Sequence, residues 1–178
     1  DRTKSVCPTC VEIRLQALMY SCLISNDQDI LARLDDIGSV ASLSSINAMV
    51  ADQLFNLAEL TGKKSCGVMG DQELIRLILG LERSGRFNTP ENGAKVVFVK
   101  AMLLHRSGDM KGAWESLMQA ESISLEALPV LQYQVYLAVE MGSADEALKA
   151  IERRSDLISQ GKLDRLEVER LKRVLDGA

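Results

Sequence analysis

The chain has 178 residues, of which 47% are hydrophobic and only 4% aromatic, and its formal net charge is −4. This length allows one domain or two small ones, and a chain poor in aromatic residues but rich in leucine, alanine and glutamate favours helices over sheets. Neither half has an excess of basic residues, so a nucleic acid is not an expected partner, and no apolar run reaches the roughly 20 residues that a membrane span requires.

Residues 1–10 are predicted to be a linker, and a helical pattern begins at Val11. Apolar residues then recur every three or four positions in successive segments, and polar breaks between the segments offer helix caps. These segments are residues 11–23, 27–36, 45–61 and 71–85. The expected apolar face of the third comprises Ile46, Met49, Val50, Leu54, Leu57, Ala58 and Leu60. We therefore expect residues 11–88 to form an N-terminal helical bundle or degenerate repeats.

The clearest internal boundary is the polar stretch RFNTPENG, residues 86–93, and a repeat follows it. Residues 108–121 (GDMKGAWESLMQAE) and residues 142–155 (GSADEALKAIERRS) share a spacing of 34 residues between Gly108 and Gly142. An apolar helical segment precedes each glycine. Self-similarity at such a period is typical of stacked helical repeats.

These two units resemble tetratricopeptide repeats, in which small residues lie where paired helices approach closely. The matching positions are Ala101, Gly108, Ala113 and Ala120 in the first unit and Gly142, Ala147 and Ile151 in the second. Two positions depart from the pattern, because Arg154 stands in the place of Ala120 and Val135 in the place of Ala101. No proline follows at the usual end of the repeat.

The resemblance implies an all-α protein of about seven to nine helices, arranged as antiparallel pairs stacked into a right-handed α-solenoid. Residues 94–178 would hold two repeats and a capping helix, which a repeat array needs to cover its last apolar face. The expected inward residues of that last helix are Leu163, Leu166, Leu171 and Val174.

The four cysteines leave several alternatives open. A zinc site would need Cys7, Cys10, Cys22 and Cys66 around one ion, but a straight helix over residues 11–23 holds Cys10 and Cys22 about 18 Å apart. The string CPTC is also found in thioredoxin-like centres, yet no strand precedes it here. Alternating helix directions place Cys22 and Cys66 at one end, so a Cys22–Cys66 disulfide and a Cys7–Cys10 disulfide fit best. Four reduced cysteines, with Cys22 buried, are the remaining alternative.

We find no pattern of catalytic residues. His105 is the only histidine and stands alone near the end of a helical segment, and no phosphate-binding glycine motif is present. We therefore expect no enzyme activity, no metal and no cofactor in this chain. The resemblance instead implies a protein- or peptide-binding surface on the first helix of each repeat. Its candidate groove residues are Val97, Lys100, Leu104, Leu131 and Gln134.

The sequence thus predicts a non-enzymatic scaffold domain that binds a protein or peptide. Paired cysteines favour a periplasmic or otherwise extracytoplasmic location, whereas reduced cysteines would favour the cytoplasm. The chain begins with Asp1 rather than methionine, as expected for a processed protein or a domain of a longer one. It is also similar to the periplasmic C-terminal domains of some bacterial surface-glycan ligases and polymerases. The alternative function is therefore a soluble periplasmic C-terminal domain of a bacterial membrane protein of surface-glycan ligation, polymerisation or export. A redox or zinc enzyme built on CPTC ranks third.

Overall fold

A computed structural model describes residues 11–41 and 45–176, so the expected linker and the Cys7–Cys10 pair lie outside the described residues. Within these ranges the chain is all-helical, as the sequence predicted, and its only β-type pairing is an isolated bridge between Ile46 and Phe87. The described helices are α2 (Val11–Leu23), α3 (Asp27–Val40), α4 (Ala48–Gly62), α5 (Asp71–Glu82), α6 (Pro90–Arg106), α7 (Met110–Ile123), α8 (Leu128–Glu140), α9 (Ala144–Glu152), α10 (Ser155–Ser159) and α11 (Arg165–Asp176).

The described residues hold ten helices, one more than the seven to nine expected. The additional element is α10, whose five residues are too few to show a helical period in the sequence. Helix α3 also continues four residues beyond the expected end at residue 36, because Ile37 adds another buried position to its inner face.

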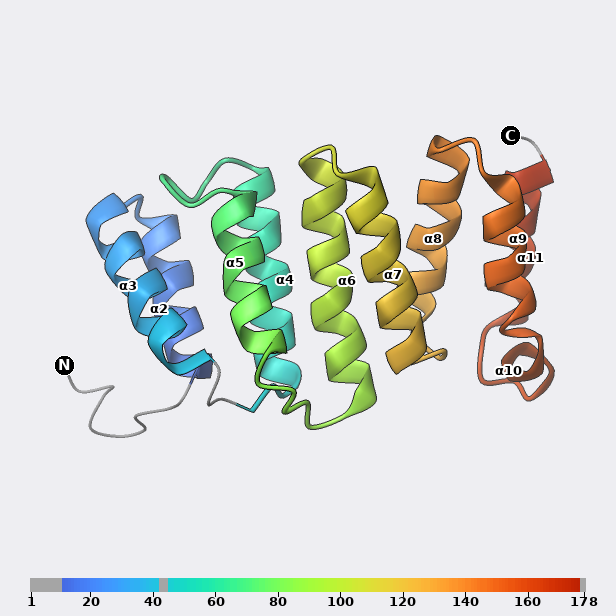
Figure 1. Ribbon diagram of the computed structural model, residues 1–178, viewed down its shortest axis with the longest axis horizontal. Helices are drawn as coiled ribbons and strands as arrows, with labels where there is room; N and C mark the ends of the chain where they lie inside the picture. Colours follow the sequence, from blue (N-terminus) through green and yellow to red (C-terminus); the bar gives the residue numbers. More distant parts are fainter. Residues whose placement is uncertain (1–10, 42–44, 177–178) are drawn as a thin grey trace.

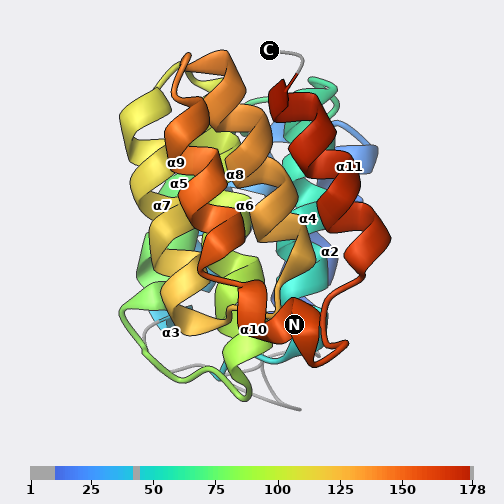
Figure 2. The ribbon, with the colours of Figure 1, turned by 90° about the vertical axis from the view of Figure 1, so that its right-hand side faces the viewer.

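The helices stand side by side in one elongated row, with α2 and α3 at one end and α9 and α11 at the other (Figure 1). Helices close in sequence are also neighbours in space: α4 packs against α2, α5 and α6, and α8 packs against α7, α9 and α11. Figure 2 looks along the row from its C-terminal end, where α11 stands to one side of α8 and α9 and packs against both. A last helix in this position shields apolar surface that the row would otherwise expose.

Helix α6 joins two parts of the apolar core. Its residues Val96, Val99 and Leu103 belong to a first cluster built mainly from α2, α4 and α5. The residues on another face of α6, among them Ala94 and Ala101, pack against α7 and α8 in a second cluster. The polar stretch 86–93 is therefore a turn in the chain, but buried contacts continue across it through α6.

Gly108 and Gly142 occupy equivalent turns. Both adopt a positive φ, +87° and +66°, which a residue without Cβ accepts without steric cost. The amide of each glycine donates to the carbonyl three residues back, and the next amide donates to the carbonyl five residues back. This is the Schellman pattern that ends a helix. The 34-residue spacing seen in the sequence therefore corresponds to the same turn built twice.

The predicted inward faces are wrong at several positions. Met49 is 58% exposed, and in α11 Leu166 and Val174 are 69% and 53% exposed. The buried residues of α11 are instead Val168 and Leu175. The polar face of α11 includes apolar residues, so its period alone favours two orientations, and packing against α8 and α9 selects between them.

Candidate functional site

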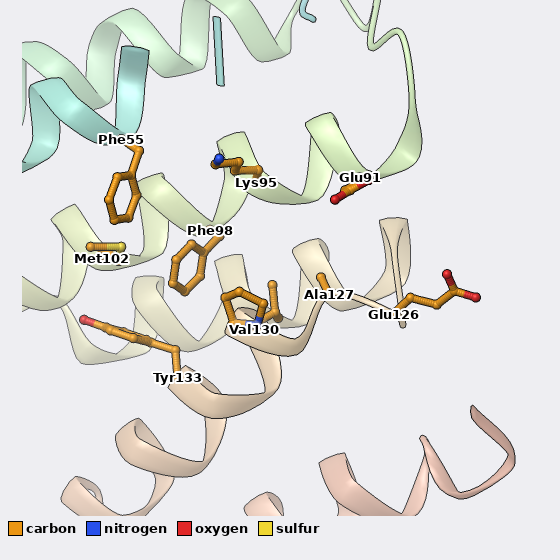
Figure 3. A pocket seen from close by; sticks show the side chains of 10 residues that line it. Phe55, Glu91, Lys95, Phe98, Met102, Glu126, Ala127, Val130 and Tyr133 are labelled. Carbon is orange, nitrogen blue, oxygen red and sulfur yellow. The ribbon is translucent and has the colours of Figure 1, made fainter. Parts of the chain in front are cut away.

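A hollow of about 560 Å³ opens between α4, α6 and α8 (Figure 3). We call it the α4–α6–α8 groove. Its lining residues are Phe55, Glu91, Lys95, Phe98, Met102, Glu126, Ala127, Pro129, Val130 and Tyr133. Most of this surface is apolar, with a few polar groups at its edge, which is the usual composition of a ligand site.

Helix periodicity explains which residues of α6 reach the groove. Glu91, Lys95, Phe98 and Met102 follow one another at spacings of four, three and four residues, so they form one stripe on the helix. The opposite wall comes from the start of α8 and the turn before it. Helix α4 adds the ring of Phe55, which lies above Met102 in Figure 3.

Aromatic contacts hold the floor of the groove together. The rings of Phe98 and Tyr133 pack edge to face, with centroids 5.5 Å apart and an interplanar angle of 89°. This arrangement places the positive edge of one ring on the negative face of the other. Because α6 supplies one ring and α8 the other, the contact also fixes the width of the groove.

The charged residues of the groove lie at its edge. Lys95 pairs with Asp52 of α4, and Glu126 pairs with Lys162 at 3.4 Å between Nζ and Oε1. Glu91 is exposed in the first turn of α6 and forms no ion pair with any described residue. Figure 3 shows Glu91 and Glu126 at the end of the groove opposite to Phe55, Met102 and Tyr133.

His105 lies in the last turn of α6 and contacts Tyr133 of α8, a partner that the sequence did not predict. Its Nδ1 lies 2.8 Å from Oη of Tyr133, and its Nε2 lies 3.1 Å from Oε2 of Glu140. Burial raises the pKa of Tyr133, and the neighbouring Tyr136 and Glu140 raise it further, so its hydroxyl stays protonated. Both ring nitrogens of His105 therefore have a partner, and the partner of Nδ1 is Tyr133, which lines the groove.

Arg106, next to His105, ties α6 to α4 and α5. Its guanidinium pairs with Asp71 and also donates to Oγ1 of Thr61, at 2.7 Å, and to the carbonyl oxygen of Ala58, at 2.9 Å. Gly62 permits this approach because a Cβ there would collide with the guanidinium. Burial alone would raise the pKa of Asp71, but hydrogen bonds from Arg106 and Thr61 outweigh it and lower that pKa.

The five candidate groove residues do not share a surface. Val97, Leu131 and Gln134 are fully buried, so they are core residues and cannot contact a partner in this conformation. Lys100 is also buried, where its Nζ pairs with Glu82 at 2.8 Å. Leu104 is half-buried and lines, with Lys100, a smaller hollow of about 280 Å³ against α5 and α7. The α4–α6–α8 groove uses the same helices α6 and α8, but different faces of them.

A buried ionic network joins α7, α8 and the end of α9. Glu121 is only 4% exposed, and it accepts hydrogen bonds from Arg153 at 2.7 Å, from Arg154 at 3.0 Å and from Gln134 at 2.8 Å. Burial alone would raise the pKa of Glu121, but these partners outweigh burial and lower it. Arg154 stands at the repeat position that Ala120 occupies in the first unit. At this position the second unit has a buried ion pair with Glu121 in place of a small apolar side chain.

Cys22 and Cys66 lie at disulfide distance, with their Cα atoms 4.2 Å apart and a sequence separation of 44. The predicted proximity of these two cysteines is confirmed. The pair connects the end of α2 to the loop between α4 and α5. Loop residue Val68 is held to the same end of the bundle, because its amide donates to Oδ1 of Asp27, the first residue of α3, at 3.2 Å.

Among the described residues, no helix combines the length and the apolar character of a membrane span. No cluster of three or more histidine, cysteine, aspartate or glutamate side chains among them is arranged to hold a metal ion. Comparison with family models, curated proteins and solved structures finds no match to this chain.

Proposed function

We propose that this chain is a non-enzymatic helical-repeat domain that binds an apolar peptide segment of another protein in the α4–α6–α8 groove. The observation that carries the proposal is the stripe of Phe98 and Met102, which lines an open hollow of about 560 Å³ together with Phe55 and Tyr133. Aromatic and methionine side chains that are partly accessible in a groove are typical anchors for a partner.

The arrangement of helices supports a solenoid of antiparallel pairs similar to tetratricopeptide repeats. The identical turns at Gly108 and Gly142 support it, as does the row of neighbouring helices in Figure 1. Helices α4, α6 and α8 would then be the first helices of successive pairs. Two interaxial steps of about 8–10 Å make a binding face of roughly 16–20 Å, the length of five or six extended residues at about 3.3 Å each.

An oxidising compartment, such as the periplasm, is the proposed location. Its support is the Cys22–Cys66 pair, since persistent disulfides are rare in reducing compartments. The test is whether Cys22 and Cys66 are disulfide-bonded in the purified protein. The unfolded, unreduced protein is treated with a thiol-alkylating reagent and its intact mass is measured. Alkylation of Cys22 and Cys66 without prior reduction would refute the proposed location.

Peptide selection tests binding directly. A random peptide library is selected on the whole chain, and the enriched peptides are measured against Met102→Glu and Met49→Glu. Met102 lines the groove, whereas Met49 lies on α4 outside it and is 58% exposed, so the two variants introduce the same charge inside and outside the site. We expect loss of binding only for Met102→Glu. No enriched sequence family, or equal loss for both variants, would refute the proposed function.

A further inference from the structure

Two of the four polar side chains that line the α4–α6–α8 groove are carboxylates. Its polar side chains are Glu91, Lys95, Glu126 and Tyr133, and the ammonium group of Lys95 is engaged by Asp52. Two carboxylates at one end accept hydrogen bonds only. The character of the other end therefore depends on whether the hydroxyl of Tyr133 donates or accepts.

His105 decides the role of Tyr133. The carboxylate of Glu140 can only accept, so Nε2 of His105, 3.1 Å away, must carry the proton of the neutral ring. Nδ1 is then an acceptor, and the hydroxyl of Tyr133, 2.8 Å from it, must donate to it. With its proton used in this way, the oxygen of Tyr133 has only lone pairs left for a ligand.

We propose that the partner is an apolar peptide segment that carries a lysine or arginine, and that His105 is a positioning residue which keeps Tyr133 an acceptor for it. This inference rests on the proposed function, because it names the chemistry of the peptide in the same groove. The apolar part of the segment contacts Phe55, Phe98 and Met102, and the basic residue lies at the end formed by Glu91 and Glu126. A donor of the segment, such as a backbone N–H, binds Tyr133.

Charge complementarity favours a basic rather than an acidic segment. The two ion pairs, Lys95–Asp52 and Glu126–Lys162, are each neutral in sum, so Glu91 is the groove carboxylate that has no ion pair with a described residue. An acidic residue of a partner would face this carboxylate, and the cation among the described lining residues, Lys95, is already paired with Asp52. Like charges placed together are a common means of excluding a wrong partner.

The other charged or titratable groups near His105 are Tyr136 and Glu140 of α8 and Arg106 of α6. Arg106 is held by Asp71 of α5 and has Glu59 of α4 nearby. If Nδ1 of His105 no longer accepts the hydroxyl proton of Tyr133, that proton can turn towards the groove, and the groove loses one acceptor. This loss weakens binding of a donor-bearing peptide by about fivefold, the value of one hydrogen bond.

The first test is the composition of the peptides selected on the whole chain at about pH 8. We expect apolar residues with a lysine or arginine at a constant spacing, and at least about threefold weaker binding to Glu91→Lys, the size of a surface charge effect. Glu152→Lys, on the exposed side of α9, is the matched control and should bind normally. Enriched apolar peptides without a basic residue would overturn this inference and leave the proposed function standing. No enriched family would overturn both.

The second test follows the hydrogen-bond roles directly. Nitrogen-15 NMR of the free protein at about pH 8 should show His105 with its proton on Nε2, and a proton on Nδ1 would overturn the inference. At that pH, binding of a selected peptide should weaken in Tyr133→Phe and in His105→Leu, which leaves the hydroxyl of Tyr133 without its acceptor. His105→Gln, whose amide oxygen can accept, should restore part of the binding. Tyr136→Phe, at an exposed neighbour of Tyr133, should bind like the wild type. Equal binding by all of these proteins would overturn the role assigned to His105.

Discussion

The two ends of the helical row build the same turn in different ways. In α6–α7 and α8–α9 the turn residues are Gly108 and Gly142, whereas in α2–α3 and in the loop after α4 they are Ser25 and Lys64. All four have a positive φ, and around each the backbone hydrogen bonds follow the same Schellman pattern. The N-terminal turns therefore keep the geometry of the C-terminal ones without the glycine that makes it favourable.

The two regions also differ in what holds neighbouring helices together. The N-terminal region has a large apolar cluster of long side chains and the Cys22–Cys66 pair. The C-terminal region packs through small residues such as Ala113 and Ala147, and it buries the charge of Glu121 between helices. The Cys22–Cys66 pair can offset unfavourable turns in one region, while the other depends on favourable turns and on the ion pairs of Glu121. Substitutions that remove one of these elements at a time measure the contribution of each.

The largest effect is expected for Glu121→Gln. Removing this carboxylate leaves Arg154, which is fully buried, without its counter-charge, and breaking a buried pair on one side costs about 3–5 kcal/mol. Urea denaturation should show this loss of unfolding free energy. Glu115→Gln removes an exposed carboxylate from the same helix, where Lys111 lies at 3.8 Å, and should cost at most about 1 kcal/mol. Equal effects would mean that the buried network contributes no more than a surface pair.

Acid should weaken the folded state through the same group. The pKa of Glu121 is lower in the folded protein than in the unfolded chain, so the folded state binds its proton less readily. The contribution of Glu121 to the free energy of unfolding is complete above its pKa in the unfolded chain, about 4.5. That contribution is lost as the pH falls through its pKa in the folded protein. Asp71, also lowered, acts in the same direction from about 3.8 downward. Unfolding free energy measured against pH should fall less steeply in Glu121→Gln. If the unfolding free energy depends on pH equally in the wild type and in Glu121→Gln, Glu121 is not the source of the acid sensitivity.

Removing the covalent link should destabilise the N-terminal region. Cys22→Ala with Cys66→Ala opens a loop that spans 44 residue steps, and chain-entropy estimates give a loss of about 3–4 kcal/mol. Hydrogen exchange should show faster opening of α2–α4 than of α6–α8. Reductant should have a similar effect on the wild type and little on the double variant. Uniform acceleration along the whole chain would show that the two regions unfold as one unit.

The sequence predicted the helices, the two glycine turns and most of the buried face of α4, but it misplaced Met49 in α4 and Leu166 and Val174 in α11. Helical period and polar breaks located nine of the ten described helices, and Gly108 and Gly142 marked equivalent turns, because glycine is needed where φ is positive. Ser25 and Lys64 gave no such signal, since neither residue type is characteristic of that conformation. Only the folded backbone shows that the N-terminal turns are of the same kind.

The proposed α4–α6–α8 groove is harder to predict than the helices, for a geometric reason. One residue along a helix rotates the side chain by about 100°, so the predicted residues Val97 and Lys100 lie on the core-facing side of α6, whereas Phe98 lines the groove. An apolar stripe alone does not show which neighbour covers it. The partners of His105 and Glu121 lie on another helix, and their distances in sequence, 28 residues to Tyr133 and 33 to Arg154, carry no local pattern.

A smaller effect is expected for Gly108→Ala and Gly142→Ala. A Cβ at either position meets no atom within 4 Å, so each variant measures the cost of a positive φ, about 1–2 kcal/mol. Gly38→Ala is the opposite control: it lies inside α3, also without a nearby atom, and should stabilise the protein by up to about 1 kcal/mol. Thermal denaturation should show a lower midpoint than the wild type for Gly108→Ala and Gly142→Ala, and a higher one for Gly38→Ala. Destabilisation by all three would point to a general intolerance of substitution.

The smallest effect concerns the unusual turns of the N-terminal region. Ser25→Gly and Lys64→Gly should each raise the unfolding free energy, because glycine removes the cost of the left-handed conformation, about 1–2 kcal/mol, while its greater flexibility in the unfolded chain returns about 0.5–1 kcal/mol. The net gain is about 0.5–1 kcal/mol per turn, measured by urea denaturation of oxidised protein. In the Cys22→Ala, Cys66→Ala background the same gain should appear, since the turn and the link are separate contributions. A loss of stability at either position would mean that the serine or lysine side chain itself supports the turn, and the contrast between the two regions would then lie only in the cysteine pair and the buried charges.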